Sequence, residues 1–452
     1  MSSLSNGSPA APAAAPYPHP LYAWYVVVVL LLAYILAFID REIISMLVPD
    51  IRQDLGISDT EISFLLGGAF AVFYTFFGIG LAWLADSANR RRIICGGIAF
   101  WSLMTAACGL ATTYPGLFMA RVGVGAGEAA LNPSALSIMK DYFPKERLGR
   151  AIGLYSAGVS SGGGIASIIG GKLYPTLKEQ GPVAVPFLGV LAPWQQVFLW
   201  VGLPGLLIAA LVLTIREPVR RDRGEDLRAT PVRETISYLL REWRTYILLY
   251  LALGMMGIMA YGVGFWVPEL LRRTFDLDPA ALGATIALRG KISIFAGLVG
   301  VFVGGWLADR AQRRHLDGYL RLCFGAYAVL CACYVVMPLL PTPEAVAWMM
   351  LPTAVAAAAA TAGGSTAIVA IAPATMRAQI VAFYYFTLNT IGFFVGPTSV
   401  ALLTDYVFRD ESMLRYSLVV VGGGACLLGL VGFVFNRRHF IARMAEVNAA
   451  AN

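Results

Sequence analysis

Twelve apolar runs, each long enough to cross a lipid bilayer as a helix, make up most of this chain. A spanning helix needs about 20 mostly apolar residues. Inside a bilayer, helices and closed barrels are the structures that satisfy every backbone hydrogen bond, and runs of this length indicate helices. The sequence therefore predicts an all-α membrane protein with twelve transmembrane helices, at residues 22–48, 59–86, 91–112, 115–142, 147–174, 193–215, 244–270, 279–308, 318–338, 344–372, 376–405 and 413–436.

The composition supports this reading and argues against several function classes. Charged residues make up 13% of the 452 residues, about half the usual share in soluble domains. The net charge of +7 lies mainly in short segments between the runs, so it does not indicate nucleic acid. The segment GGKL around Lys172 lacks the glycine and the Ser/Thr of a nucleotide-binding P-loop. We expect no nucleotide and no cofactor. The six cysteines lie inside apolar runs without a C-x-x-C pair, which favours small buried side chains over disulfides or metal ligands.

The distribution of Lys and Arg predicts the orientation. An even number of spans puts both termini on one side. That side carries 23 of the 34 basic residues, the opposite side carries six, and the rest lie within spans. Cytoplasmic loops carry the excess of Lys and Arg, so we expect an inner-membrane protein with both termini in the cytoplasm. The expected organisation is a disordered cytoplasmic tail (1–20), an N-terminal bundle (21–215), a cytoplasmic linker (216–243), a C-terminal bundle (244–436) and a cytoplasmic tail (437–452).

Two sequence echoes indicate that the chain is duplicated. AWLADSANRRR ends the second run and GWLADRAQRRH ends the eighth, so Asp86 corresponds to Asp309. GVSSGGG in the fifth run corresponds to GFFVGP in the eleventh. Matching motifs at the second and fifth spans of each half predict two pseudo-symmetric six-helix bundles. In such transporters the substrate site lies between the halves, near the membrane midplane.

These motifs resemble those of the major facilitator superfamily of transporters. GWLADRAQRR matches its loop motif, Arg121-x-x-x-Gly125-x-Gly127 resembles its fourth-span motif, and GFFVGP resembles its Gly-Pro motif. The resemblance implies that four charged residues hold the cytoplasmic gate. They are Asp86, Arg90, Asp309 and Arg313.

Two longer stretches resemble the Spinster branch, the sphingolipid and lysolipid transporters, in a bacterial form. They are FIDREIISMLVPDIRQDLGIS and RVGVGAGEAALNPSA. The resemblance implies an amphipathic lipid substrate with a charged head. The Gly-Glu-Ala element also occurs in organic-anion symporters of the superfamily, so a proton-coupled symporter of small organic anions, such as sugar acids, is the alternative.

Charged residues inside the spans are the candidate site, because each is costly unless it faces a partner or a wet cavity. Asp40 lies roughly 12 Å from the end of the first span at 1.5 Å per residue, and Arg121 lies at a similar depth in the fourth. An Asp40–Arg121 ion pair is therefore possible. Glu128 lies two turns beyond Arg121 on the same face, and Arg289 reaches a comparable level from the other half.

The charge types suggest roles for these residues. No histidine lies within a span, so we expect Asp40 and Glu128 to exchange the protons. Guanidinium groups match anionic headgroups, which makes Arg41, Arg121 and Arg289, together with Glu128, the expected substrate-binding set. The predicted function is a proton-coupled secondary transporter that works by alternating access, embedded in membrane lipids and needing no oligomer. An enzyme is not expected, because no span clusters His, Cys or Ser nucleophiles.

Overall fold

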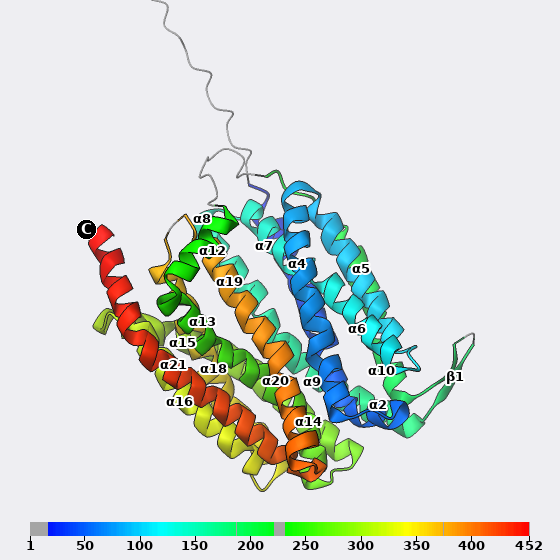
Figure 1. Ribbon diagram of the computed structural model, residues 1–452. Helices are drawn as coiled ribbons and strands as arrows, with labels where there is room; N and C mark the ends of the chain where they lie inside the picture. The colour runs from blue at the N-terminus through cyan, green and yellow to red at the C-terminus, as the bar shows by residue number, and fades with distance from the viewer. Residues whose placement is uncertain (1–16, 187, 221–230, 374, 452) are drawn as a thin grey trace, which may run out of the picture.

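The computed structural model describes residues 17–186, 188–220, 231–373 and 375–451. It is a bundle of long helices that run between two ends of the molecule (Figure 1). We call the upper end in Figure 1, where α8 and α12 lie, the linker end, and the lower end, with α2 and α14, the hairpin end. Most of the expected tail (1–20) and residues 221–230 of the expected linker lie outside the described residues.

The part of the chain up to residue 215, here the N-terminal half, contributes eleven described helices. Their bounds are α1 Pro20–Ile43, α2 Val48–Leu55, α3 Asp59–Ser63, α4 Ala69–Ser87, α5 Arg90–Cys108, α6 Tyr114–Glu128, α7 Leu131–Tyr142, α8 Lys145–Ser156, α9 Gly158–Gln180, α10 Pro193–Gly202 and α11 Pro204–Val212. A 3-10 turn (Ile44–Met46) follows α1, and a π-helical turn (Phe64–Gly68) joins α3 to α4.

The rest of the chain from residue 231, the C-terminal half, begins with a short helix of the connection. The bounds are α12 Val232–Arg241, α13 Trp243–Gly257, α14 Gly264–Phe275, α15 Pro279–Arg314, α16 Gly318–Val336, α17 Pro343–Trp348, α18 Met350–Ile371, α19 Arg377–Thr390, α20 Gly396–Leu402 and α21 Leu414–Ala451. Single π-helical or 3-10 turns lie at Ile258–Val263, Met337–Leu339, Ile391–Val395, Leu403–Phe408 and Glu411–Met413.

Ten described helical segments are long and apolar enough to cross a membrane. They coincide with ten of the twelve predicted spans. The other two, at 91–112 and 115–142, are helical but are not among the ten. Helix α5, which covers the first, begins with three consecutive arginines, and the second is divided between α6 and α7 at Ala129 and Ala130. The helical membrane fold is as predicted, while the count of twelve spans stays a prediction.

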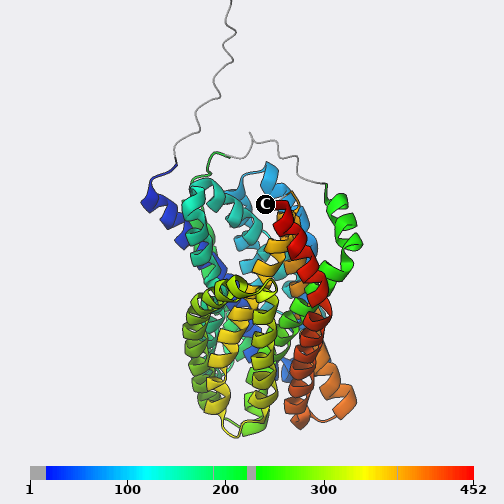
Figure 2. The ribbon, with the colours of Figure 1, turned by 90° about the vertical axis from the view of Figure 1, so that its left-hand side faces the viewer.

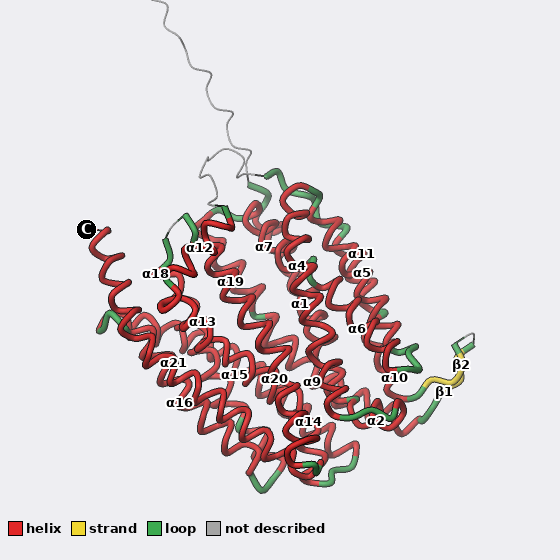
Figure 3. Tube along the Cα trace, in the orientation of Figure 1, coloured by secondary structure: helices red, strands yellow, loops and turns green. Residues whose placement is uncertain are grey.

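Two features depart from the simple expectation. A short antiparallel hairpin, β1 (Val183–Val185) and β2 (Gly189–Leu191), projects from the hairpin end (Figure 3). These are the two strands in the part of the chain that the structure describes. Within the segment expected as a C-terminal tail, 437–452, helix α21 continues without a break to Ala451.

Small residues let the two halves touch backbone to backbone where α9 crosses α15. A Cβ atom on Gly283 of α15 would collide with the carbonyl oxygen of Gly171 in α9 and would lie 2.8 Å from the Cγ of Pro175. Close approach through small residues is a common way for membrane helices to associate. The glycines of the fifth span therefore serve packing.

Gly283→Ala is expected to destabilise the protein by about 1–3 kcal/mol, the usual cost of overpacking a tight contact. Thermal unfolding in detergent measures the effect. Gly305→Ala is the matched control on the same helix, since its added Cβ meets no atom within 4 Å. Equal unfolding temperatures for the two variants would contradict the packing role.

Asp317, between α15 and α16, ties the linker end of α21 to the bundle. Its carboxylate accepts hydrogen bonds from Nε of Arg321 at 2.8 Å and from Nε of Arg437, on α21, at 2.6 Å. Burial alone would raise the pKa of Asp317, but the two guanidinium groups outweigh it and hold the pKa below its usual value. The folded protein thus binds this proton less tightly than the unfolded chain does.

The contribution of Asp317 to stability is therefore present above the ordinary aspartate pKa of about 3.9 and is lost as the pH falls through the lower folded value. Because both arginines are partly exposed, we expect the Asp317 carboxylate to add about 1 kcal/mol to the free energy of unfolding. Wild type should unfold at a higher temperature than Asp317→Asn at pH 7, and the difference should shrink in acid. A difference that is constant down to pH 3 would contradict this account.

Candidate functional site

Four of the predicted charged residues lie together in the interior, where α1 passes α6. Asp40 and Arg41 come from α1, and Arg121 and Glu128 come from α6. All four side chains are buried. Each charge must therefore be compensated within the protein or be neutral.

Glu128 pairs with Arg41. The Nε of Arg41 donates to Oε2 of Glu128 at 2.6 Å, while the other carboxylate oxygen of Glu128 has no hydrogen-bond partner. The free oxygen leaves Glu128 able to take a further donor. Arg41 and Glu128 form a buried ion pair, with side chains 8% and 0% exposed.

Aromatic rings surround the guanidinium group of Arg41. Its Cζ lies 4.9 Å from the ring centre of Phe38, 4.6 Å from Phe70, 5.1 Å from Tyr74 and 6.0 Å from Phe393. Rings within about 6 Å attract a cation through their π-faces. Phe393 belongs to the C-terminal half and the other three rings to the N-terminal half, so Arg41 lies where the two halves meet.

The expected Asp40–Arg121 ion pair is not formed in this structure. Arg121 donates from Nη1 to the backbone carbonyl of Asp40 at 3.1 Å and from Nε to that of Leu65 at 3.4 Å. The carboxyl of Asp40 instead neighbours Trp101 and Thr105 of α5, and neither of its oxygens has a hydrogen-bond partner. Consecutive helix positions point about 100° apart, so Arg41 faces the other half while Asp40 faces the interior of its own.

Arg289 interacts with a different carboxylate. Glu42 of α1 and Arg289 of α15 attract each other electrostatically, without a hydrogen bond between them that the structure describes. This places one attraction between α1 and α15, across the two halves. Arg289 therefore lies within electrostatic range of α1, and its role in substrate binding stays a prediction.

Tyrosine and asparagine side chains next to Arg41 were not predicted. Asn132 donates to the Tyr74 hydroxyl at 3.2 Å and accepts from the Tyr155 hydroxyl at 2.6 Å, and Tyr155 stacks on Tyr34 at 4.6 Å. From the other half, the ring of Tyr261 stacks on Phe393 at 3.7 Å. An asparagine inside an apolar run was the signal that could have indicated this polar group.

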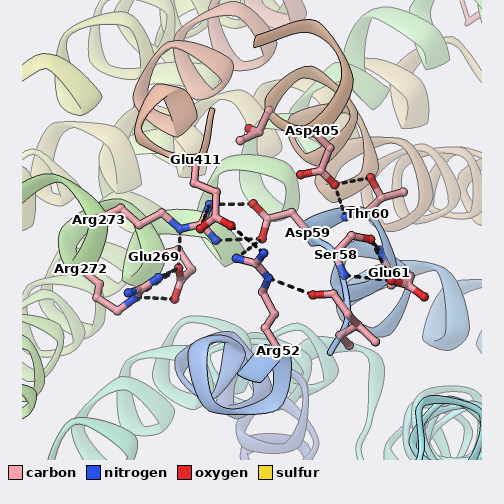
Figure 4. A network of polar contacts seen from close by, with 12 residues as sticks. Arg52, Ser58, Asp59, Thr60, Glu61, Glu269, Arg272, Arg273, Asp405 and Glu411 are labelled. Carbon is pink, nitrogen blue, oxygen red and sulfur yellow. Dashed lines mark hydrogen bonds and ion pairs between the residues drawn. The ribbon is translucent and has the colours of Figure 1, made fainter. Parts of the chain in front are cut away.

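A second set of charges closes the hairpin end between the halves (Figure 4). Arg273 of α14 donates to both carboxylate oxygens of Asp59 in α3, at 2.7 and 2.8 Å, and to Glu269 at 2.7 Å. Arg52 pairs with Asp59 at 3.1 Å and with Glu411 at 2.8 Å. The ion pairs that the structure describes between the two halves lie at this end.

Asp405 adds a further contact between the halves at this end. Its Oδ2 accepts hydrogen bonds from the backbone N–H of Thr60 at 2.8 Å and from the hydroxyl of Thr60 at 2.6 Å. Glu269 is also buried, against Arg272 and Arg273 of its own helix. The contact between Asp59 and Arg273 could not be found from the sequence, because these residues lie 214 positions apart.

Of the residues expected to form a gate, Arg90, Asp309 and Arg313 are not joined to one another by any contact that the structure describes. Asp309 and Arg313 are exposed. Arg90 is buried against its own half, where its guanidinium donates to Asp141 and, at 2.7 Å, to Glu217. Asp86 lies in α4, and its side chain is outside the described residues.

Comparison with known proteins then decides the family. Residues 30–397 match the Major Facilitator Superfamily. The chain belongs to this superfamily. It is 28% identical over 62% of its length to a probable L-galactonate transporter of Escherichia coli, and 24% identical over 65% of its length to the protein spinster of Drosophila melanogaster. The matched regions cover 60% and 47% of those two relatives.

A solved structure of similar fold supports the Spinster resemblance. It is a bacterial homologue of the human lysosomal transporter Spinster in an inward-facing, unoccupied conformation, with a TM-score of 0.73 and 26% identity over 95% of this chain and 98% of that one. The crystal structure of a D-xylose–proton symporter, at 15% identity and a TM-score of 0.63, shares the fold. These major facilitator relatives are transporters and not enzymes, as predicted, and the chain is a multi-pass membrane protein.

Proposed function

We propose that this major facilitator protein is a proton-coupled secondary transporter that works by alternating access in the cell inner membrane. The linker end faces the cytoplasm, with both termini, and the hairpin end faces outward. The ion pairs at the hairpin end and the likeness to an inward-facing homologue support an inward-facing state. One six-plus-six bundle is sufficient for transport, so no oligomer is required.

The observation that carries the proposal is the buried Arg41–Glu128 pair inside a ring of aromatic side chains from both halves. A guanidinium next to apolar rings suits an amphipathic substrate, because the anionic or zwitterionic head meets Arg41 while the chain lies along the rings. The substrate class is therefore a lysolipid or a sphingosine-phosphate-like lipid. Arg289 and Arg121 supply the other positive charges, and Glu128 helps to orient the head.

Asp40 and Glu128 carry the protons. A carboxyl buried without a partner is costly when ionised, and we propose that Asp40 holds a proton in this state. Protonation of Glu128 would release Arg41 to an anionic substrate, because the guanidinium would lose its counter-charge. Proton binding and substrate binding are then linked through one arginine.

In the opposite, outward-facing state we propose that the linker end closes through the loop-motif residues. Asp309 and Arg313 are exposed here and so are able to form that contact. Asp86 and Arg90 are the corresponding residues of the N-terminal half.

A second candidate is the symport of small organic anions such as sugar acids. The likeness to a probable L-galactonate transporter favours it, and so does the hydrogen-bonded group of Tyr74, Asn132 and Tyr155 beside Arg41. Hydroxyl and amide groups in a site recognise sugar hydroxyls better than they recognise acyl chains.

Proton movement in liposomes that enclose a pH-sensitive dye tests the proposal. We expect lysolipid to drive proton flux in wild type and no such flux in Asp40→Asn, with the variant unfolding at a similar temperature because Asn is close in shape and neutral. Flux with sugar acids alone would assign the second candidate. Unchanged flux in both Asp40→Asn and Glu128→Gln would contradict the proton-coupling roles.

A further inference from the structure

Helix α12, in the connection between the halves, exposes an apolar stripe at the linker end. Val232, Ile236 and Leu240 of α12 are 55, 41 and 60% exposed, and Trp243, which follows them at the start of α13, is 46% exposed. Spacings of three and four residues place side chains on one face of a helix. Figure 2 shows α12, the green helix at the upper right, set beside the bundle with one side free of the other helices.

This stripe is not the face by which α12 packs on the protein. Thr235 and Leu239 form the packed face and are buried. Tyr238 is next to them, where its hydroxyl lies 3.3 Å from that of Tyr246 and its ring 5.9 Å from Cζ of Arg443 on α21. The apolar surface of α12 is therefore wider than the part that the protein covers.

The remaining face of α12 is polar. Arg233, Glu234, Ser237 and Arg241 are exposed, and Arg241 lies 3.6 Å from Glu242. A helix with an exposed apolar sector beside a charged one is typical of helices that lie in a membrane surface. A helix of a soluble partner protein could also cover such a stripe. The position of α12 relative to the membrane decides between the two.

The position of α12 determines what covers the stripe. Only Glu242 separates α12 from α13, which opens a membrane-crossing segment at Trp243. Tryptophan is enriched where spans meet the headgroups. The stripe therefore begins at the depth of the headgroups, so bilayer lipid is the partner nearest to it.

We propose that α12 lies in the surface of the bilayer at the linker end. Its stripe inserts at the boundary of headgroups and acyl chains, and Arg233 and Arg241 contact anionic headgroups, since basic residues near an anionic leaflet gain electrostatic energy. The connection between the two halves is thereby anchored to lipid, independently of the substrate that the transporter carries.

Nitroxide labels on single introduced cysteines test this in lipid nanodiscs. Ile236→Cys and Leu240→Cys report on the stripe, and Ser237→Cys on the polar face is the matched control. All three positions are exposed, so the label does not disturb the core. Two of the six native cysteines are partly exposed, and labelled wild type supplies the background to subtract.

We expect the ratio of collisions with oxygen to collisions with a water-soluble nickel chelate to be several-fold higher at positions 236 and 240 than at 237. Adding anionic phospholipid to the nanodiscs should raise it further, and Arg233→Gln together with Arg241→Gln should remove that increase. Equal ratios at 236 and 237 would place the stripe in water and overturn the proposal. Protection of 236 and 240 from both reagents would assign the stripe to a protein partner and also overturn it.

Discussion

Arg273→Ala should open the hairpin end of the protein. Arg273 is 5% exposed at its side chain and joins Asp59 and Glu269, so its loss takes the buried counter-charge from both carboxylates and leaves them the more exposed Arg52 and Arg272. Removing one partner of a buried pair costs about 3–5 kcal/mol. In the opposite state water can reach these carboxylates, so most of the cost falls on the closed state. At about 1.4 kcal/mol per factor of ten, the ratio of molecules open at the hairpin end to molecules closed there should rise a hundred-fold or more.

Distances between spin labels at the hairpin ends of the two halves measure this shift. Arg272→Ala is the matched control, because Arg272 is 36% exposed at its side chain and pairs with Glu269 of its own helix. Asp59→Asn should act like Arg273→Ala, since it removes the other side of the same contact. The role of Arg273 would be refuted if its variant kept the distances of the Arg272 variant.

Glu128→Gln should destabilise the described state by about 3–5 kcal/mol, because it leaves the buried Arg41 guanidinium without its carboxylate. The cation–π contacts with four rings do not replace a full counter-charge, since they contribute about 2 kcal/mol when desolvated. Thermal unfolding in detergent should show the loss, and proton-dependent transport should disappear with it.

A double-mutant cycle separates the pair from general damage to the core. Arg41→Gln combined with Glu128→Gln removes both charges, so the double variant should be more stable than Glu128→Gln alone. Transport should stay absent in the double variant, because stability and function depend on the pair in different ways. A double variant less stable than both single variants would show that the pair does not act as a unit.

The helical membrane fold was predictable because spanning helices need long apolar runs, and such runs are visible in any stretch of sequence. The candidate residues were predictable for a related reason. A charge inside an apolar run is costly, so Asp40, Arg41, Arg121 and Glu128 are visible without a structure. Depth along a helix, at a fixed rise per residue, also placed Asp40 and Arg121 at a similar level, and Arg121 donates to the backbone carbonyl of Asp40 at 3.1 Å.

The partners were not predictable, because they depend on which way each side chain points and on which helices lie side by side. The sequence suggested Asp40 with Arg121, whereas the structure pairs Glu128 with Arg41 and turns Asp40 toward Thr105. The charges at the hairpin end look like ordinary loop residues. Their contact arises when the two halves close on each other.

By itself, then, the sequence determined the membrane class, the family resemblance and the buried charges, since each depends on local pattern. The tertiary structure decided which charges neutralise one another and which end is closed. Arg273 and Asp59 illustrate the difference, because they meet only through the packing of α14 against the start of the second span. Ion-pair energies depend on distance and burial, and both quantities exist only in the folded protein.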